Sequence, residues 1–309
     1  MANIMVTGAT GLLGRAVVKQ LTAVGHRVIA TGFSRAEAGT HRLDLTQAAE
    51  VEAFIAREQP EVIVHCAAER RPDVSERSPE HALALNLSAS QTLAEVAKTH
   101  QAWLLYISTD YVFDGTTPPY AEDAAPNPVN FYGESKLQGE TCVLNIDSGF
   151  AVLRLPILYG EVTQLSESAV LVLINQLLDS RPQRVDHWAI RSPTSTADIA
   201  NAIAKLILRQ LHAVDVSGIY HFSATQTMTK YQMLLSLGEL LGIDTAHLLP
   251  EPTPMDSAKR PQDCTLSCGR LAEFGIHSQL EFSAGLNQAL AQSCAALAAV
   301  GCRLRNHHG

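Results

Sequence analysis

The sequence predicts an α/β protein built on a doubly wound parallel sheet, with a smaller and partly discontinuous C-terminal domain. Two observations predict this fold. The first half alternates short runs of Val, Ile and Leu with amphipathic stretches of helical period, as buried parallel strands and their crossover helices do. A glycine-rich turn directly follows the first run, at the place where open α/β sheets bind nucleotides.

Apolar runs in the first half are predicted as the strands of this sheet. Each is short and apolar nearly throughout, as expected of strands that are buried on both faces. The stretches between them, such as GRAVVKQLTAVG and TQAAEVEAFIAREQP, are predicted as helices that cross over the sheet. This alternation is typical of a Rossmann domain, which we place at residues 1–160. The predicted strands lie at 3–9, 27–33, 61–68, 103–109 and 151–157.

The rhythm changes after residue 160. SESAVLVLINQLLDS, TADIANAIAKLILRQL and TKYQMLLSLGELLG are predicted as helices, the last ending at Gly242, and GIYHFSA (218–224) as a strand. The proline-rich stretch 250–263 is predicted to be irregular. We therefore expect a smaller substrate-binding region over 161–309, with returns to the Rossmann domain from about 190–225.

The composition is that of an ordinary globular protein. The chain has 309 residues, of which 46% are hydrophobic and 17% charged, with a net charge of −8. That charge excludes the basic face that nucleic acids and anionic membranes require. No apolar run approaches the ~20 residues of a membrane span. The N-terminus MANIMVTG lacks the pattern of a signal peptide, so we expect a cytoplasmic location.

The cysteines and histidines do not form a recognisable metal motif. The six cysteines are scattered, and CTLSC at 264–268 has no second Cys or His pair to complete a zinc site. We therefore predict no disulfide framework and no metal.

The turn VTGATGLLG after the first strand is predicted to bind a dinucleotide. Its glycines are spaced three apart, which allows a tight turn and a close approach of the backbone to a pyrophosphate at the start of the next helix. The predicted contacts in this turn are Gly8, Thr10, Gly11, Leu12, Leu13 and Gly14.

The end of the second strand indicates which dinucleotide binds. An NAD site carries Asp or Glu there, whereas this chain has Phe33, Ser34 and Arg35. Because Arg35 suits a 2′-phosphate, we predict NADP(H); the alternative is a solvent-facing arginine. Asp44, in RLDLT at the end of a further strand that comes next after 27–33, could meet the adenine amino group or cap a helix. The remaining predicted cofactor contacts are Leu45, Ala67, Ala68, Tyr132, Lys136 and Leu158.

NFYGESKLQGE (130–140) places Tyr132 four residues before Lys136. Of the seven tyrosines, Tyr132 alone has a lysine at this spacing, which puts both side chains on one face of a helix. The pair could still arise by chance from the composition alone.

Both motifs together resemble the extended short-chain dehydrogenases/reductases. ISTDYVFDG (107–115), PNPVNFYGESKLQGE (126–140) and KRPQDCTL (259–266) resemble the dTDP-4-dehydrorhamnose reductase family, and the likeness covers nearly the whole chain. HCAAERRPDV (65–74) and LPILYGEV (155–162) are more similar still to the regulatory beta subunits of methionine adenosyltransferase, which share this fold.

The resemblance assigns Thr109, Tyr132 and Lys136 as the catalytic triad. It implies hydride transfer from NADPH to a ketone, with Tyr132 protonating the oxygen and Thr109 polarising the carbonyl. We expect the Lys136 ammonium to lower the tyrosine pKa from ~10 towards ~7, which corresponds to about 4 kcal/mol. Asn86 matches a supporting asparagine of the family, or else faces solvent from a helix.

The sequence also departs from the reductase pattern. The family's Ser-Trp pair after the fifth strand is replaced by Pro156, Ile157 and Leu158, so the sugar platform is missing. Arg15 stands where some members carry a metal-binding glutamate, which again predicts no magnesium. The cluster ERRPDV (69–74) could clamp a nucleotide diphosphate, line a protein-binding surface, or be a solvated charge cluster.

Two classes of function follow. The first is an NADPH-dependent reductase of a small-molecule carbonyl, such as the keto group of a dTDP-linked 4-keto-6-deoxy sugar. The second is an NADP-binding regulatory subunit with little or no catalysis, whose partner is a methionine adenosyltransferase catalytic subunit. An intact triad favours the enzyme, although fold and motif do not determine function.

Overall fold

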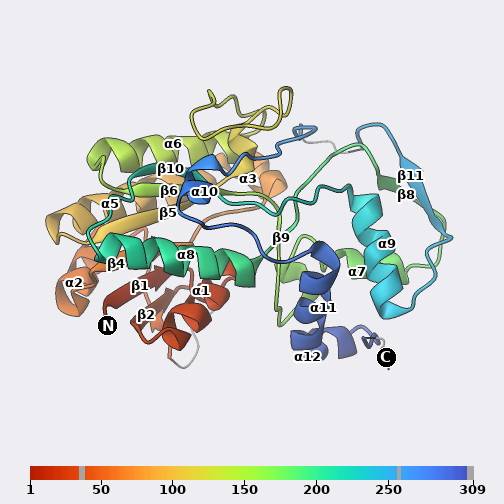
Figure 1. Ribbon diagram of the computed structural model, residues 1–309, viewed down its shortest axis with the longest axis horizontal. Coiled ribbons are helices and arrows are strands. Elements are labelled where there is room, and N and C mark those ends of the chain that lie inside the picture. The colour runs from red at the N-terminus through yellow and green to blue at the C-terminus, as the bar shows by residue number, and fades with distance from the viewer. Residues whose placement is uncertain (35–38, 256–258, 305–309) are drawn as a thin grey trace.

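The protein is centred on a parallel sheet of seven strands, seen in Figure 1. The computed structural model describes residues 1–34, 39–255 and 259–304. The strand order is β10-β6-β5-β4-β1-β2-β3 and every pairing in the sheet is parallel. The strands are β1 (Asn3–Thr7), β2 (Arg27–Gly32), β3 (His41–Arg42), β4 (Val62–His65), β5 (Trp103–Thr109), β6 (Ala151–Leu155) and β10 (Gly218–His221).

The strand order reverses between β1 and β4. The chain first builds outward from β1 to β2 and β3, then returns to the other side of β1 with β4. The helices that follow adjacent strands diverge at such a point, and ligands of open α/β sheets bind there, beyond the carboxyl ends of the strands.

Helices form a layer on either side of the sheet (Figure 1). On one side α1 packs along α8, and on the other α2, α5 and α6 pack in sequence. The bounds are α1 (Leu12–Ala23), α2 (Ala48–Glu58), α3 (Pro72–Arg77), α4 (Pro79–Leu83), α5 (Ala89–Thr99), α6 (Phe131–Ile146), α8 (Thr196–Leu211) and α10 (Gly269–Glu273). Along the described ranges, no helix combines the length and the apolar character needed to cross a membrane.

The smaller unit lies beside the carboxyl ends of the strands. It contains two two-stranded parallel pairs, β8 with β11 and β7 with β9. Its elements are β7 (Leu158–Tyr159), α7 (Leu173–Leu178), β8 (Gln183–Asp186), β9 (Thr194–Ser195), α9 (Lys230–Leu241), β11 (Leu248–Glu251), α11 (Phe282–Gln292) and α12 (Cys294–Ala298).

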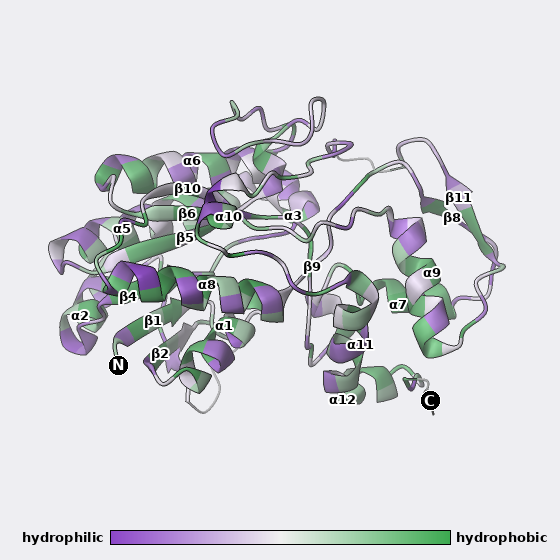
Figure 2. Ribbon diagram, in the orientation of Figure 1, coloured by the Kyte–Doolittle hydropathy of each residue, from purple (hydrophilic) through white to green (hydrophobic). Residues whose placement is uncertain are grey.

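Two large groups of buried hydrophobic side chains underlie these units. The first surrounds the central strands, which Figure 2 colours as hydrophobic, and the second joins α7, α9, α11 and α12. The second group begins at Tyr159 and reaches Cys302.

Three of the elements that differ from the prediction have a local cause in the structure. Strand β6 ends at Leu155, because the following proline cannot donate to the ladder. The helix expected over SESAVLVLINQLLDS begins only at Leu173, since the Ser168 hydroxyl accepts the backbone N–H groups of Val170 and Leu171. The stretch predicted as irregular from residue 250 begins with the end of β11, which pairs with β8.

Candidate functional site

The glycine turn forms a cradle that side chains would fill. Gly8 has a φ of +61°, and a Cβ on it would lie 2.8 Å from the Ala67 nitrogen. A Cβ on Gly14 would lie 2.1 Å from the Gly8 carbonyl oxygen. Helix α1 begins directly after Gly11, so its first N–H groups face this space with the positive end of the helix dipole. The turn therefore fits the pyrophosphate of a dinucleotide.

Other predicted cofactor residues are buried or partly buried. Leu13 and Leu45 belong to the hydrophobic core. Ala67 follows β4, which lies next to β1 in the sheet. Its N–H donates to the Thr7 hydroxyl at 3.3 Å. Ala68 follows it and is partly buried.

The end of β2 carries the next part of the predicted site. Phe33 is 51% exposed, Ser34 is exposed, and Arg35 lies outside the described residues. Sequence reasoning missed Arg42, whose guanidinium carbon lies 5.1 Å from the centre of the Phe33 ring. In the sequence, only the position of Arg42 two residues before Asp44, a predicted cofactor contact, points to it.

Asp44 does not cap a helix. Its Oδ1 accepts the Thr46 N–H at 3.0 Å and the Thr46 hydroxyl at 2.7 Å, which closes a local turn. The N-cap of α2 is Gln47, so the capping alternative is wrong.

Tyr132 lies in the first turn of α6, beside the end of β5. Asn130 caps the helix by accepting the Gly133 N–H at 2.9 Å. The Tyr132 phenol lies near Thr109, the last residue of β5, and the Thr109 side chain acts to lower the pKa of this phenol. The ring of Tyr111 packs edge-on to that of Tyr132 at 5.9 Å. The strand end and the helix start therefore bring the two predicted catalytic hydroxyls together.

Lys136 is buried one helical turn further on. Its Nζ donates to the Ile107 carbonyl at 2.7 Å and lies 3.9 Å from the centre of the Tyr106 ring. Burial lowers the pKa of Lys136 to about 7, and the Glu140 carboxylate opposes this shift.

The expected lowering of the Tyr132 pKa is wrong. Burial raises the pKa of Tyr132 well above its usual range, although the Thr109 side chain and the charge of Arg70 oppose the shift. The physical reason is that desolvation disfavours the phenolate more than nearby cations stabilise it. Tyr132 is therefore a protonated phenol at neutral pH.

Asp110 is a site residue that sequence reasoning missed. It is buried beside Thr109, whose hydroxyl donates to its Oδ1 at 3.2 Å. Burial raises the pKa of Asp110 to about 6, against the lowering effect of the buried Arg191. In the sequence, only the position of Asp110 directly after Thr109 points to this residue, because a sequence does not show which carboxylates become buried.

Asn86 is buried in a π-helical turn over Ala84–Ser88, so the solvent-facing alternative is wrong. Its Oδ1 accepts the Glu69 N–H at 2.9 Å, and its Nδ2 donates to the Glu69 carbonyl and to the Ser135 hydroxyl, both at 3.0 Å. This side chain fastens the segment after β4 to the helix that carries Tyr132 and Lys136.

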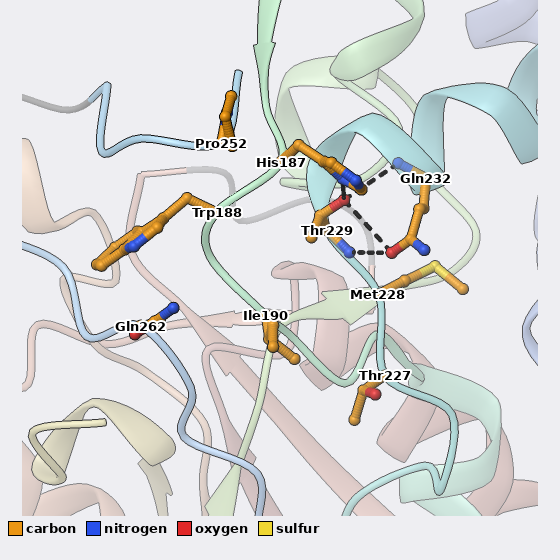
Figure 3. Close-up of a pocket in the computed structure, with 9 residues that line it drawn as sticks. All are labelled: His187, Trp188, Ile190, Thr227, Met228, Thr229, Gln232, Pro252 and Gln262. Carbon is orange, nitrogen blue, oxygen red and sulfur yellow. Dashed lines mark hydrogen bonds between the residues drawn. The ribbon is translucent and has the colours of Figure 1, made fainter. Parts of the chain in front are cut away.

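A pocket of about 470 Å³ opens in the smaller unit, shown in Figure 3. His187 turns towards Thr229 and Gln232, and its Nδ1 lies 2.8 Å from the Thr229 hydroxyl, whereas Trp188 points the opposite way. Leu158 does not line this pocket; it begins β7 and pairs with Thr194. The lining residues are His187, Trp188, Ile190, Thr227, Met228, Thr229, Gln232, Pro252 and Gln262.

The pocket adjoins the Tyr132 site through the backbone. Arg191 follows the lining residue Ile190, and its guanidinium carbon lies 5.6 Å from the centre of the Tyr111 ring. Arg191 also donates to the Gln262 carbonyl at 3.0 Å. One peptide bond therefore separates the lining residue Ile190 from a side chain that packs on Tyr111.

Arg15 and, from the cluster ERRPDV, Arg71 are paired within the chain. Arg15 donates to the carboxylate of Glu167 at 2.7 Å and to the Thr10 carbonyl at 2.8 Å, which ties the glycine turn to the smaller unit. Arg71 forms a bidentate pair with Glu69, with distances of 2.9 and 2.8 Å.

The sheet, its glycine cradle and the hydroxyls beside Lys136 define the class of protein, a Rossmann-fold member of the short-chain dehydrogenase/reductase type. Comparison with known proteins gives the family. Residues 1–294 match the family described as RmlD substrate binding domain, and the chain belongs to this family.

Relatives and solved structures cover nearly the whole chain. Methionine adenosyltransferase 2 subunit beta of Xenopus tropicalis is 44% identical over 93% of this chain and 86% of its own length. The dTDP-4-keto-6-deoxy-D-glucose reductase of Streptomyces niveus is 33% identical over 92% and 95%. The structure of dTDP-4-dehydrorhamnose reductase from Bacillus anthracis in complex with NADP has a TM-score of 0.82 and 26% identity, covering 95% of this chain and 100% of that one.

Proposed function

We propose that the protein is an NADPH-dependent reductase that delivers a hydride to a keto group. The observation that carries this proposal is the placement of the Tyr132 phenol near Thr109, one helical turn before the buried Lys136. A phenol and a hydroxyl in this arrangement can bind and protonate one carbonyl oxygen. The glycine cradle and the NADP complex of the Bacillus anthracis relative support the coenzyme.

The side chains have complementary roles in this reaction. When bound, NADPH supplies the hydride. Tyr132 gives its proton to the carbonyl oxygen, and its raised pKa keeps that proton in place at neutral pH until the alkoxide develops. Thr109 holds the same oxygen. Lys136, with a pKa of about 7, can give up or accept a proton near neutral pH and so restore the tyrosine.

A nucleotide-linked 4-keto-6-deoxy sugar is the proposed substrate class. The pocket of about 470 Å³ lies within the range of small-molecule sites, roughly 300–1,000 Å³, and adjoins the Tyr132 site. The exposed part of Trp188 offers a flat apolar surface for a base. The name of the Streptomyces niveus relative supports the same class.

The test is the oxidation of NADPH in the presence of a dTDP-4-keto-6-deoxy sugar. Tyr132→Phe is expected to lower kcat about 10²–10⁴-fold, because the general acid is lost. The matched control is Tyr220→Phe, which alters a buried tyrosine on the edge strand β10, outside the site. Equal turnover by both variants would contradict the proposal.

A second candidate is an NADP-binding regulatory subunit of methionine adenosyltransferase. It is favoured by the 44% identity with the Xenopus tropicalis beta subunit and by the missing Ser-Trp pair at Pro156–Leu158. The test is size-exclusion chromatography with a purified methionine adenosyltransferase catalytic subunit. A stable complex without NADPH oxidation supports this candidate, whereas oxidation without a complex supports the first.

A further inference from the structure

We propose that Arg42 binds the 2′-phosphate of NADP(H) and thereby sets the preference for this coenzyme over NAD(H). The inference rests on the proposed function only for the identity of the coenzyme. Arg42 lies on the short edge strand β3, at the end of the sheet where the adenosine half of a dinucleotide lies.

The register of the sheet places Arg42 next to the glycine turn. Arg42 pairs with Gly32, the last residue of β2. A Cβ on Gly32 would lie 3.2 Å from the hydroxyl of Thr10, which belongs to the turn itself. The end of β2 in a Rossmann domain meets the adenosine ribose, so Arg42 stands beside the 2′ position.

Phe33 provides a platform for the arginine. The guanidinium carbon lies 5.1 Å from the centre of the Phe33 ring, and that ring is 51% exposed although large aromatic side chains are usually buried. A cation over an aromatic face is held by the ring quadrupole. The guanidinium keeps its N–H donors at its edge, where a phosphate can accept two of them.

The surrounding side chains favour a phosphate over a ribose hydroxyl. NAD sites place an acidic residue at the end of β2, where this chain has Phe33 and Ser34. Asp44, two residues beyond Arg42, turns its carboxylate onto Thr46. The cation and the polar serine are therefore the groups that the described chain presents at this position.

The test measures coenzyme binding directly by isothermal titration calorimetry. Arg42→Gln is expected to weaken NADPH binding about 10- to 100-fold while changing NADH binding less than about threefold, because a charge-assisted bidentate contact is lost only with the 2′-phosphate. The probes 2′,5′-ADP and ADP should show the same difference. The matched control is Arg57→Gln, which removes another exposed arginine 4.9 Å from a phenylalanine ring centre, on helix α2.

Further arms separate the alternatives. Phe33→Leu should weaken NADPH binding in wild type but have little further effect in Arg42→Gln. If Arg35→Gln removes the preference and Arg42→Gln does not, the assignment of Arg42 is overturned. An equal loss of NADPH and NADH binding in Arg42→Gln would also overturn it. Absence of turnover in a protein that binds NADPH preferentially contradicts the reductase but leaves this assignment intact.

Discussion

Helix α6 carries one buried cation, Lys136, and contacts a second, Arg154 of β6, through Glu140 one turn further on. Lys136 is 2% exposed and donates to the Ile107 carbonyl. Arg154, from β6, is 1% exposed and forms a bidentate ion pair with Glu140, with contacts of 3.0 and 2.7 Å. A neutral His221 accepts from Arg154 at 3.4 Å and donates to the Ser267 carbonyl.

The two cations differ in the groups that compensate their buried positive charge. Arg154 has a carboxylate in contact, and burial together with Arg154 lowers the pKa of His221 to about 3, so this histidine is neutral near neutral pH. Lys136 has a carbonyl and a ring instead, and its pKa falls to about 7. Compensated charges of this kind connect elements, whereas a poorly compensated charge can exchange a proton.

The largest expected effect comes from breaking the compensated pair. Glu140→Gln leaves Arg154 buried without its carboxylate and should lower the free energy of unfolding by about 3–5 kcal/mol, measured by urea denaturation. The paired replacement Glu140→Leu with Arg154→Met should lose less, because no charge remains buried. A loss below about 1 kcal/mol in Glu140→Gln would show that solvent reaches this pair.

The next effect comes from removing the poorly compensated cation. The folded-state pKa of Lys136 is about 7 against an ordinary 10.5, so the unfolded state binds more protons between these values and wild-type stability rises with pH across them. The free energy of unfolding of Lys136→Met should therefore exceed that of wild type by roughly 2–4 kcal/mol below pH 7. This figure already includes a loss of about 1–3 kcal/mol for the Ile107 carbonyl, which is left without a donor. Above pH 10 the variant should become the less stable protein.

Denaturation curves at pH 6.5 and pH 10 check this reversal of sign. An exposed pair elsewhere in the molecule offers a baseline, since Lys19→Gln breaks a contact with Glu161 at the surface and should change stability by less than about 0.5 kcal/mol. A gain that does not depend on pH would show that Lys136 carries no titrating charge.

Asp110 extends the comparison to a buried carboxylate. Its folded-state pKa is about 6 against an ordinary 3.8, so the folded state binds more protons in this window and wild-type stability falls as pH rises through it. Asp110→Asn should match wild type below pH 4 and exceed it by about 2–3 kcal/mol above pH 6. Thermal unfolding in buffers of pH 4 and pH 7.5 tests this; a variant less stable than wild type at pH 7.5 would contradict it.

The parallel sheet could be predicted because its strands are continuous apolar runs. The runs that contain Val62–His65 and Trp103–Thr109 are apolar nearly throughout, as strands buried between two helical layers are. β8 and β11 were not predicted, since QRVD and LLPE are short and partly polar and are strands only because they pair with each other. The division into 1–160, with returns from 190–225, and 161–309 stays a prediction, although the two hydrophobic groups favour it.

The site was predictable only where a motif carried it. The glycine spacing and the Tyr132–Lys136 spacing are local, so they can be recognised in one chain. Asp110, Arg191 and Arg42 depend on which distant segments cover or flank them, and no periodicity marks them. Burial itself reversed the expected direction of the Tyr132 pKa, because a sequence does not show how much water a side chain loses.

The π-helical turn at Ala84–Ser88 has a consequence for how this chain can vary in length. Each residue advances an α-helix by roughly 100°, so deleting one residue here would restore a regular helix while rotating everything before it by that angle. Asn86 would then no longer meet both backbone groups of Glu69. Insertions and deletions in natural relatives are therefore expected to avoid this turn and to collect in surface loops, where a change in length moves nothing else.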